Sequence, residues 1–204
     1  MKVLIFGATG GVGQHVLNMT LKKGYEVSVF VRSPEKLTVT ENVTIIQGDA
    51  FNAQQVADAI KGQDVVMSCL GSSGGMKKSN ELETMGKNIA DGMVLHNVQR
   101  LVYCASAGIN REIPGLTGKM VMKLLENPLK DHRAALDYYL SKNITYTIAR
   151  PMGLKNDPLS LTYRESFDSV PPKAGSIARA SVAHFMVKAI EDPTYENKSV
   201  GISN

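Results

Sequence analysis

Three glycines spaced three residues apart, Gly7, Gly10 and Gly13, follow directly on an apolar run. Glycines permit a tight turn, remove the β-carbons that would keep a pyrophosphate away, and let a strand and a helix pack closely. The residues after the turn fit a helix, whose N-terminus offers amide hydrogens to phosphates. The spacing therefore predicts a dinucleotide site, although a glycine-rich turn that binds nothing is the alternative. The residues expected to hold the dinucleotide on this turn are Gly7, Thr9, Gly10, Gly11, Val12 and Gly13.

The second apolar run indicates which dinucleotide binds. It ends at Arg32 and Ser33, with Lys36 nearby. An NAD site usually carries Asp or Glu at this point for the ribose 2′-hydroxyl, whereas a cation accommodates a 2′-phosphate. Arginine offers a planar fork of donors with a permanent charge, and the neighbouring hydroxyl adds another donor. We therefore predict NADP (NADPH) as the cofactor, the alternative being that Arg32 is a solvated cation at a strand end.

Short β-branched or aromatic runs recur along the chain and alternate with helix-compatible segments. The expected strands are Val3 to Phe6, Val27 to Val31, Val43 to Ile46, Val65 to Cys69, Leu101 to Cys104 and Tyr146 to Ala149. The expected helices are Gly11 to Lys23, Ala53 to Lys61, Asn80 to His96, two within Leu116 to Lys142 separated near Pro128, and Arg179 to Glu191. Ser33 to Asn42 is too short and broken for a full helix, and Arg150 to Pro172 is expected to be rich in loops.

This alternation predicts an α/β fold, a doubly wound and mostly parallel sheet (Rossmann fold) with helices on both faces. We expect residues 1–204 to form a single NAD(P)-binding Rossmann domain. The net charge of +4 is scattered among carboxylates, which argues against a nucleic-acid partner. The opening apolar run is too short for a signal peptide, and no stretch approaches membrane-spanning length.

Cysteine and histidine usage adds two further expectations. Cys69 and Cys104 both lie in apolar runs, which suits buried reduced thiols in a reducing compartment, so we predict a cytoplasmic protein. The four histidines and two cysteines lack the spacing of metal ligands, so no metal site is expected.

Motifs at the ends of the later expected strands extend the pattern over nearly the whole chain. They are Gln47-Gly48-Asp49-Ala50, Cys69-Leu70-Gly71, Ala105-Ser106-Ala107-Gly108 and Ala149-Arg150-Pro151. In these motifs the sequence resembles the NmrA-like, atypical branch of the short-chain dehydrogenases/reductases. Within that branch it is most similar to the biliverdin reductase B and flavin reductase type, through Lys130-Asp131-His132-Arg133 and the stretch from Asn143 to Thr147.

The resemblance implies cofactor contacts at the carboxyl ends of the strands, where ligands of doubly wound sheets bind. It implies that Asp49 and Ala50 hold the adenine edge, that Leu70, Gly71 and Ser72 flank the pyrophosphate and ribose, that Ser106 lies near the nicotinamide, and that Pro151 and Met152 wall the nicotinamide's far side. Where the biliverdin reductase B type has a second active-site histidine, this chain offers Met152, a departure that weakens any specific assignment to biliverdin.

Tyr138 and Lys142 fit the Tyr-x-x-x-Lys pattern with which conventional short-chain dehydrogenases lower the pKa of a catalytic tyrosine. The family's pair falls about two helical turns earlier in the sequence, so we interpret this pair as a coincidence. Ser106 and His132 remain as candidates to orient a substrate or relay a proton. Their alternative roles are a hydrogen bond from Ser106 to the strand-end backbone and a surface position for His132 at a helix start.

Without a tyrosine acid, conjugated acceptors are the favoured substrates, because the cofactor carries the hard chemistry and a delocalised product can take its proton from water. We therefore predict an enzyme, an NADPH-dependent oxidoreductase that transfers hydride to a flavin, quinone or tetrapyrrole-like acceptor. A non-catalytic NADP-binding redox sensor of the NmrA type is the first alternative, and a nucleotide-sugar epimerase or dehydratase is the second. The expected partner is a small-molecule substrate, and both a monomer and a dimer remain open.

Overall fold

Strands and helices alternate along the chain in a computed structural model that describes residues 1–167 and 169–204. The strands are β1 (Lys2–Phe6), β2 (Glu26–Val31), β3 (Val43–Gln47), β4 (Val65–Ser68), β5 (Arg100–Cys104), β6 (Thr145–Pro151), β7 (Leu154–Lys155), β8 (Arg164–Ser166), β9 (Ile177–Ala178) and β10 (Lys198–Ser203). The helices are α1 (Gly13–Lys22), α2 (Ala53–Ile60), α3 (Glu81–Leu95), α4 (Gly115–Leu124), α5 (Glu126–Leu140) and α6 (Arg179–Glu191). Two short 3-10 helices cover Pro34–Lys36 and Pro193–Tyr195.

The central sheet has eight strands in the order β3-β2-β1-β4-β5-β6-β10-β8. All neighbouring strands run parallel except β8, which pairs antiparallel with β10 at one edge. The chain leaves β1 toward β2 and β3, then returns to the other side of β1 at β4. The order of strands therefore reverses beside β1, and doubly wound sheets bind ligands outside the carboxyl ends of the strands at such a reversal.

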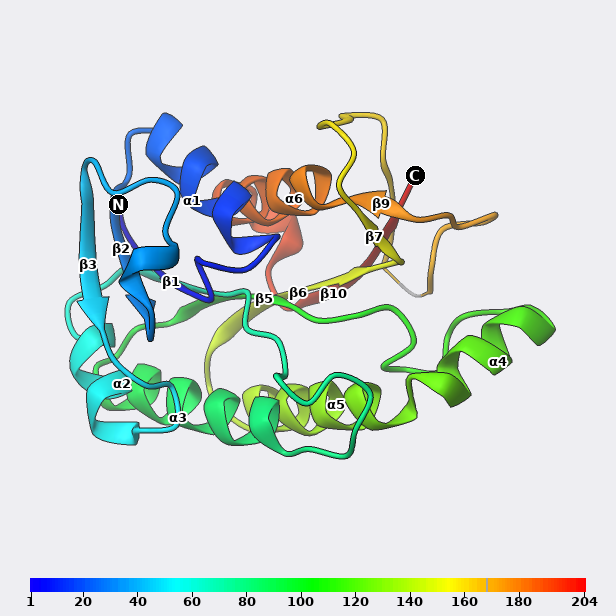
Figure 1. Cartoon of the computed structure of the whole chain (residues 1–204), viewed down its shortest axis with the longest axis horizontal. Coiled ribbons are helices and arrows are strands. Elements are labelled where there is room, and N and C mark those ends of the chain that lie inside the picture. The colour runs from blue at the N-terminus through cyan, green and yellow to red at the C-terminus, as the bar shows by residue number, and fades with distance from the viewer. Residues whose placement is uncertain (168) are drawn as a thin grey trace.

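Helices cover both faces of the sheet, as the sequence predicts. In Figure 1, α1 and α6 lie above the sheet, and α2, α3 and α5 lie below it. Strand β1 shows why its residues form one unbroken apolar run. Val3 and Ile5 pack in the cluster under α1 and α6, whereas Leu4 and Phe6 pack in the cluster over α2, α3 and α5. Successive side chains of a strand point to opposite faces, so a strand covered on both sides must be apolar throughout.

The six expected strands and the expected helices are all present, which confirms the α/β fold class. The expected break in the long helical region occurs at Leu125, and Pro128 lies in the first turn of α5, where a missing amide hydrogen costs little. The sequence analysis missed β10, which extends the sheet beyond β6. Figure 1 shows α4 extending away from the body of the molecule. In the described part of the chain, no helix combines the length and the apolar character needed to cross a membrane.

Candidate active site

The turn between β1 and α1 needs glycine at two of its three marked positions. Gly7 has φ +79°, and a Cβ there would stand 2.6 Å from the carbonyl oxygen of Cys69 on the neighbouring strand's end. A Cβ on Gly13 would stand 2.1 Å from the carbonyl oxygen of Gly7. The amide of Gly10 donates to that same oxygen at 2.9 Å and closes the turn. The glycines therefore fix the turn tightly against both β4 and the start of α1.

The N-terminus of α1 is left open to a ligand. Among the described residues, no side chain caps this helix, and its first turn carries no carboxylate. The side-chain amide of Gln14 donates to the carbonyl oxygen of Thr9 at 3.0 Å, and this bond ties the turn to the first turn of α1. The first amides of a helix have no partner within the helix and carry partial positive charge, so this end suits a pyrophosphate.

A cleft of about 200 Å³ lies directly in front of the turn. The loops that follow β1, β2, β3 and β4 supply its walls, and α3 closes one side. Residues predicted to bind cofactor that line it are Gly7, Thr9, Gly10, Arg32, Ser33, Asp49, Ala50, Leu70 and Gly71. The structure thus brings together segments that are far apart in sequence, at the reversal of strand order. Phe51, Glu81 and Met85 also line the cleft, and the sequence analysis did not single them out.

The β2 end of the cleft carries positive charge. Arg32 is exposed there, and Ser33 and Lys36 line the same wall. The side-chain amide of Gln47 donates to the carbonyl oxygen of Arg32 at 3.4 Å and links the ends of β3 and β2. Within residues 1–167 and 169–204, no carboxylate forms an ion pair with Arg32. Its guanidinium is therefore available to a phosphate.

The β3 end of the cleft is shaped by Asp49. One of its carboxylate oxygens accepts the amide of Phe51 at 3.1 Å, and its own amide donates to the side chain of Gln55 at 2.9 Å. These contacts stiffen the loop while the second carboxylate oxygen stays available as an acceptor. The neighbouring Ala50 is buried, and its carbonyl oxygen accepts the side-chain amide of Asn88 at 2.9 Å. The resulting loop presents one polar side chain and one small apolar residue.

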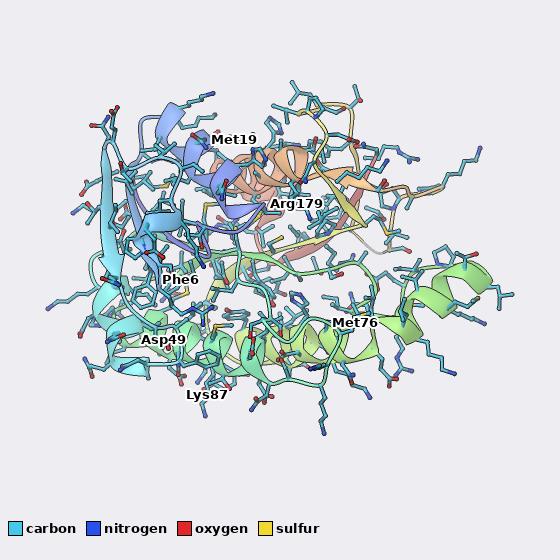
Figure 2. All side chains as sticks on the ribbon, in the orientation of Figure 1. Phe6, Met19, Asp49, Met76, Lys87 and Arg179 are labelled. Atoms are coloured by element: carbon cyan, nitrogen blue, oxygen red, sulfur yellow. The ribbon has the colours of Figure 1, made fainter. Side chains whose placement is uncertain are left out.

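Arg179, which the sequence analysis missed, lies beside the glycine turn. It is the first residue of α6, and Figure 2 labels it next to the end of α1 where the turn leads in. Its Nη1 donates to the side-chain oxygen of Asn156 at 2.7 Å, which orients the guanidinium. The sequence offered no signal for this contact, because α6 and the turn come together only through the packing of α1 on α6.

Ser106, Pro151 and Met152 lie beside one another at the ends of β5 and β6, outside the lining of the cleft. The amide of Ala107 donates to the carbonyl oxygen of Pro151 at 2.9 Å and joins the two strand ends. Ser106 is half-buried, and its hydroxyl donates to the carbonyl oxygen of Ala107 at 3.0 Å. This bond is the backbone role named above as the alternative for Ser106, and it leaves the hydroxyl oxygen free to accept.

The loop after β4 is held by a carboxylate from another helix. Buried Asp131, from α5, accepts the hydroxyl of Ser79 at 2.6 Å and the amides of Leu82 and Glu83 at 3.2 and 3.0 Å. It therefore caps the N-terminus of α3 from a different helix. Ser72, expected near the cofactor, lies outside the cleft lining and bonds to Ser79 at 3.1 Å. Asp131 thus positions the loop that carries Leu70 and Gly71.

His132 lies within α5, half-buried, and its Nδ1 is 2.6 Å from the phenol oxygen of Tyr103 on β5. Burial lowers the pKa of His132 to about 4, although neighbouring Asp131 acts in the opposite direction. Burial also raises the pKa of Tyr103 well above its usual value. The pair is therefore neutral near pH 7. Its place in mid-helix differs from the surface position at a helix start that was the alternative for His132.

Tyr138 lies in the last turn of α5, and Lys142 lies just after that helix, shortly before β6 begins. Both are therefore at the edge of the sheet where the parallel strands start, whereas the glycine turn is at the edge where they end. The hydroxyl of Tyr138 donates to Asp91 on α3 at 2.8 Å, and Lys142 forms an ion pair with the same carboxylate at 2.9 Å. This geometry supports the interpretation of the pair as a coincidence of spacing. The neighbouring Tyr139 is buried in the core.

A family model described as NAD(P)H-binding matches residues 7–193. Among curated relatives, the uncharacterized sugar epimerase YhfK of Bacillus subtilis is 26% identical over 220 residues, covering 100% of this chain and 94% of that protein. A wide-type short-chain dehydrogenase/reductase from Veillonella parvula, solved in complex with NADP, has a TM-score of 0.84 at 22% identity. The match covers 100% of this chain and 94% of the Veillonella chain. ChuY, an anaerobilin reductase from Escherichia coli O157:H7, has a TM-score of 0.83 at 20% identity, with 98% and 97% covered. At these identities the two structures share the fold with this chain.

Proposed function

Since the chain belongs to this NAD(P)H-binding family, we propose that it is an NADPH-dependent oxidoreductase that passes hydride to a small conjugated acceptor, such as a flavin, a quinone or a tetrapyrrole-like molecule. We propose further that the described chain works as one NAD(P)-binding domain. The observation that carries the proposal is the position of Tyr138 and Lys142. Both side chains contact Asp91 at the opposite edge of the sheet, so this pair is not placed to act as the conventional acid beside a nicotinamide.

The residues of the cleft fit a dinucleotide. Gly7 and Gly13 leave room where any β-carbon would collide with backbone, and the open amides of α1 suit the pyrophosphate. Arg32, Ser33 and Lys36 favour a 2′-phosphate, and therefore NADP over NAD. Asp49 would accept a hydrogen bond from the adenine end of the ligand. A dinucleotide that continued along the carboxyl edge of the sheet past β4 would reach Ser106 at the end of β5.

The bound nicotinamide supplies the hydride, and the protein supplies orientation. Ser106 would accept one hydrogen bond from the carboxamide NH2 of the nicotinamide or from a donor on the acceptor, since its O–H already donates to Ala107 and its oxygen still has a free lone pair. Pro151 and Met152 would form an apolar wall beside it. A delocalised acceptor spreads the added negative charge over its π-system and takes its proton from water. The site therefore needs no dedicated acid for this class of substrate.

An epimerase acting on a nucleotide sugar is the second candidate, and the name of the Bacillus subtilis relative favours it. Such chemistry removes a proton from a sugar hydroxyl as hydride leaves the carbon, so it needs a base beside the nicotinamide. The neutral, half-buried His132 would have to fill that role, and its Nδ1 already contacts Tyr103. This requirement makes the reduction of conjugated acceptors the better-supported reaction.

A single incubation series tests the proposal. Purified protein is mixed with NADPH and, separately, with flavins, quinones and a linear tetrapyrrole, and NADPH loss is followed by absorbance against reactions without protein. Parallel reactions contain nucleotide sugars, analysed for interconversion. An Arg32→Ala variant serves as the matched control. Activity that belongs to this cleft should show a raised KM for NADPH in the variant, whereas a contaminating reductase would not respond.

Sustained NADPH consumption with a conjugated acceptor supports the proposal. Interconversion of nucleotide sugars without net NADPH consumption would replace it with the epimerase. Tight NADPH binding without turnover of any of these compounds would overturn it in favour of the redox sensor.

A further inference from the structure

A second and larger pocket, of about 530 Å³, lies beside the loop that follows β5. Gly108, two residues after Ser106, forms part of its wall. Gly108 has φ +96°, and a Cβ there would stand 3.2 Å from Leu129 and from Met122. The loop therefore rests closely on α4 and α5. Because Ser106 lies two residues before Gly108 on the loop that follows β5, this pocket is next to the proposed position of the hydride acceptor.

The floor of this pocket is apolar. Ile109 and Leu129 are buried, and Met122 is half-buried between them. The loop that follows β5 is anchored to the sheet, because its residue Glu112 forms an ion pair with Arg150, which is fully buried on β6. The hydrophobic surface is thus preformed and stays in place. A flat aromatic or aliphatic body would gain by covering it.

The rim of the pocket is strongly basic. Two of its cations are already neutralised, because Lys130 pairs with Glu126 at 2.7 Å and Arg133 pairs with Asp137. Arg111, Lys119 and Lys123 have no carboxylate partner within the described residues. The pKa of Glu126 lies below its usual value, first because of Lys130 and further because of Arg111 and Lys123. These spare cations therefore act on the same small volume.

Lys119 and Lys123 are one helical turn apart on α4 and both line the pocket, opposite Arg111 on the loop. We propose that this basic pocket binds the acidic group, a carboxylate or a phosphate, of an organic anion whose apolar body covers Ile109, Met122 and Leu129. The proposal rests on the proposed function in one respect: the anion is the hydride acceptor itself. The protein would then prefer acidic conjugated acceptors to neutral ones of the same ring system.

Two matched pairs of probes test this preference. FMN and riboflavin share one ring system and differ by a phosphate, and anthraquinone-2-carboxylate and its methyl ester differ by a carboxylate. Affinities are measured without NADPH, by flavin fluorescence and by calorimetry for the quinones, and KM values are measured with NADPH. The variant is Lys119→Gln/Lys123→Gln. The control, Lys22→Gln/Lys61→Gln, removes the same net charge from exposed positions at the C-terminal ends of α1 and α2.

We expect the anion of at least one pair to bind more tightly than its neutral partner, and the pocket variant to weaken anion binding about tenfold relative to the neutral partner. The pair that responds tells phosphate from carboxylate. The control should leave this ratio unchanged, and added salt should lower it. If the unmodified protein binds each anion no better than its neutral partner, the proposal is wrong, and this comparison needs no variant. An equal effect of the control would also overturn it.

The outcome is separable from that of the proposed function. Charge-dependent binding of FMN without any NADPH consumption would refute hydride transfer to flavins while keeping the anion pocket. Turnover in which the two members of each pair have the same KM would do the reverse.

Discussion

The side chain of Arg179 lies directly over Gly11: a Cβ on Gly11 would stand 2.8 Å from both Cδ and Nε of Arg179. A residue of α6 thus occupies the space that a side chain on the glycine turn would fill. The contact places a cation beside the N-terminus of α1, where the open amides already favour an anion. The positive charge beside the turn therefore comes from a residue that is far from Gly11 in the sequence.

Arg179→Gln should weaken NADP and NAD by similar factors, about tenfold each, because a pyrophosphate contact is common to both dinucleotides. Isothermal calorimetry with each cofactor measures this. Arg179→Lys, which keeps the charge, should recover part of the loss. A loss confined to NADP would instead put Arg179 at the 2′-phosphate.

Arg32→Ala should act selectively, weakening NADP binding while leaving NAD binding nearly unchanged. Only the 2′-phosphate contact is lost, and a charge-assisted hydrogen bond contributes about 1.5 to 3 kcal/mol, or roughly ten- to hundredfold in affinity. The same calorimetry, run beside Arg179→Gln, compares the two cations directly. Equal losses for both cofactors would show that Arg32 does not recognise the phosphate.

Sequence alone predicted the parts of the fold that depend on local chemistry. The turn at Gly7 and Gly13 was predictable because only glycine fits where β-carbons would meet backbone. The strands were predictable because burial on both faces demands unbroken apolar runs. Strand β10 was missed because Lys198–Ser203 mixes polar and apolar residues, with Gly201 in its middle. Its partners in the sheet, β6 and β8, are both far away from it in the sequence.

The residues of the candidate site also divide into those that the sequence could indicate and those that depend on packing between distant elements. Arg32 was indicated by its place at the end of a strand and Asp49 by the family resemblance, and both follow parallel strands and line one cleft. Arg179 and Asp131 act through helices that meet other elements only in the folded chain, which no spacing pattern encodes. Asp131 stood next to His132 in a motif that drew attention for its histidine, yet its carboxylate caps α3. The distinction between local and packing-dependent contacts explains which cleft residues the sequence could indicate and which it missed.

His132 should make the protein less stable as pH falls below neutral. Its pKa is near 4 in the folded chain and near 6.5 when unfolded, so between these values the unfolded state binds more protons and stability falls with falling pH. Urea unfolding at pH 7 and pH 5 should show a loss that is about 1 to 2 kcal/mol smaller in His132→Asn, which keeps a neutral partner for Tyr103. Equal losses in both proteins would mean that His132 is protonated normally in the fold.

The catalytic roles of Ser106 and Tyr138 can be ranked. Tyr138→Phe should leave kcat within a few fold, because its hydroxyl bonds to Asp91 at the edge of the sheet away from the glycine turn. Ser106→Ala should have the larger effect, since the proposed site places Ser106 beside the nicotinamide. Losing a positioned proton-transfer group costs about 10²-fold or more when proton transfer limits the rate, and less when hydride transfer or product release does.

Steady-state rates with the best acceptor from the panel test this ranking, and circular dichroism checks that both variants fold. Tyr138→Phe removes one partly buried hydrogen bond to Asp91 but leaves the ion pair of Lys142 with Asp91, so we expect this variant to fold. A solvent isotope effect on kcat adds a second readout: if Ser106 takes part in proton transfer, its removal should change the effect, whereas removal of the Tyr138 hydroxyl should not. An inactive Tyr138→Phe enzyme beside a fully active Ser106→Ala enzyme would contradict the proposed site and restore a conventional tyrosine mechanism.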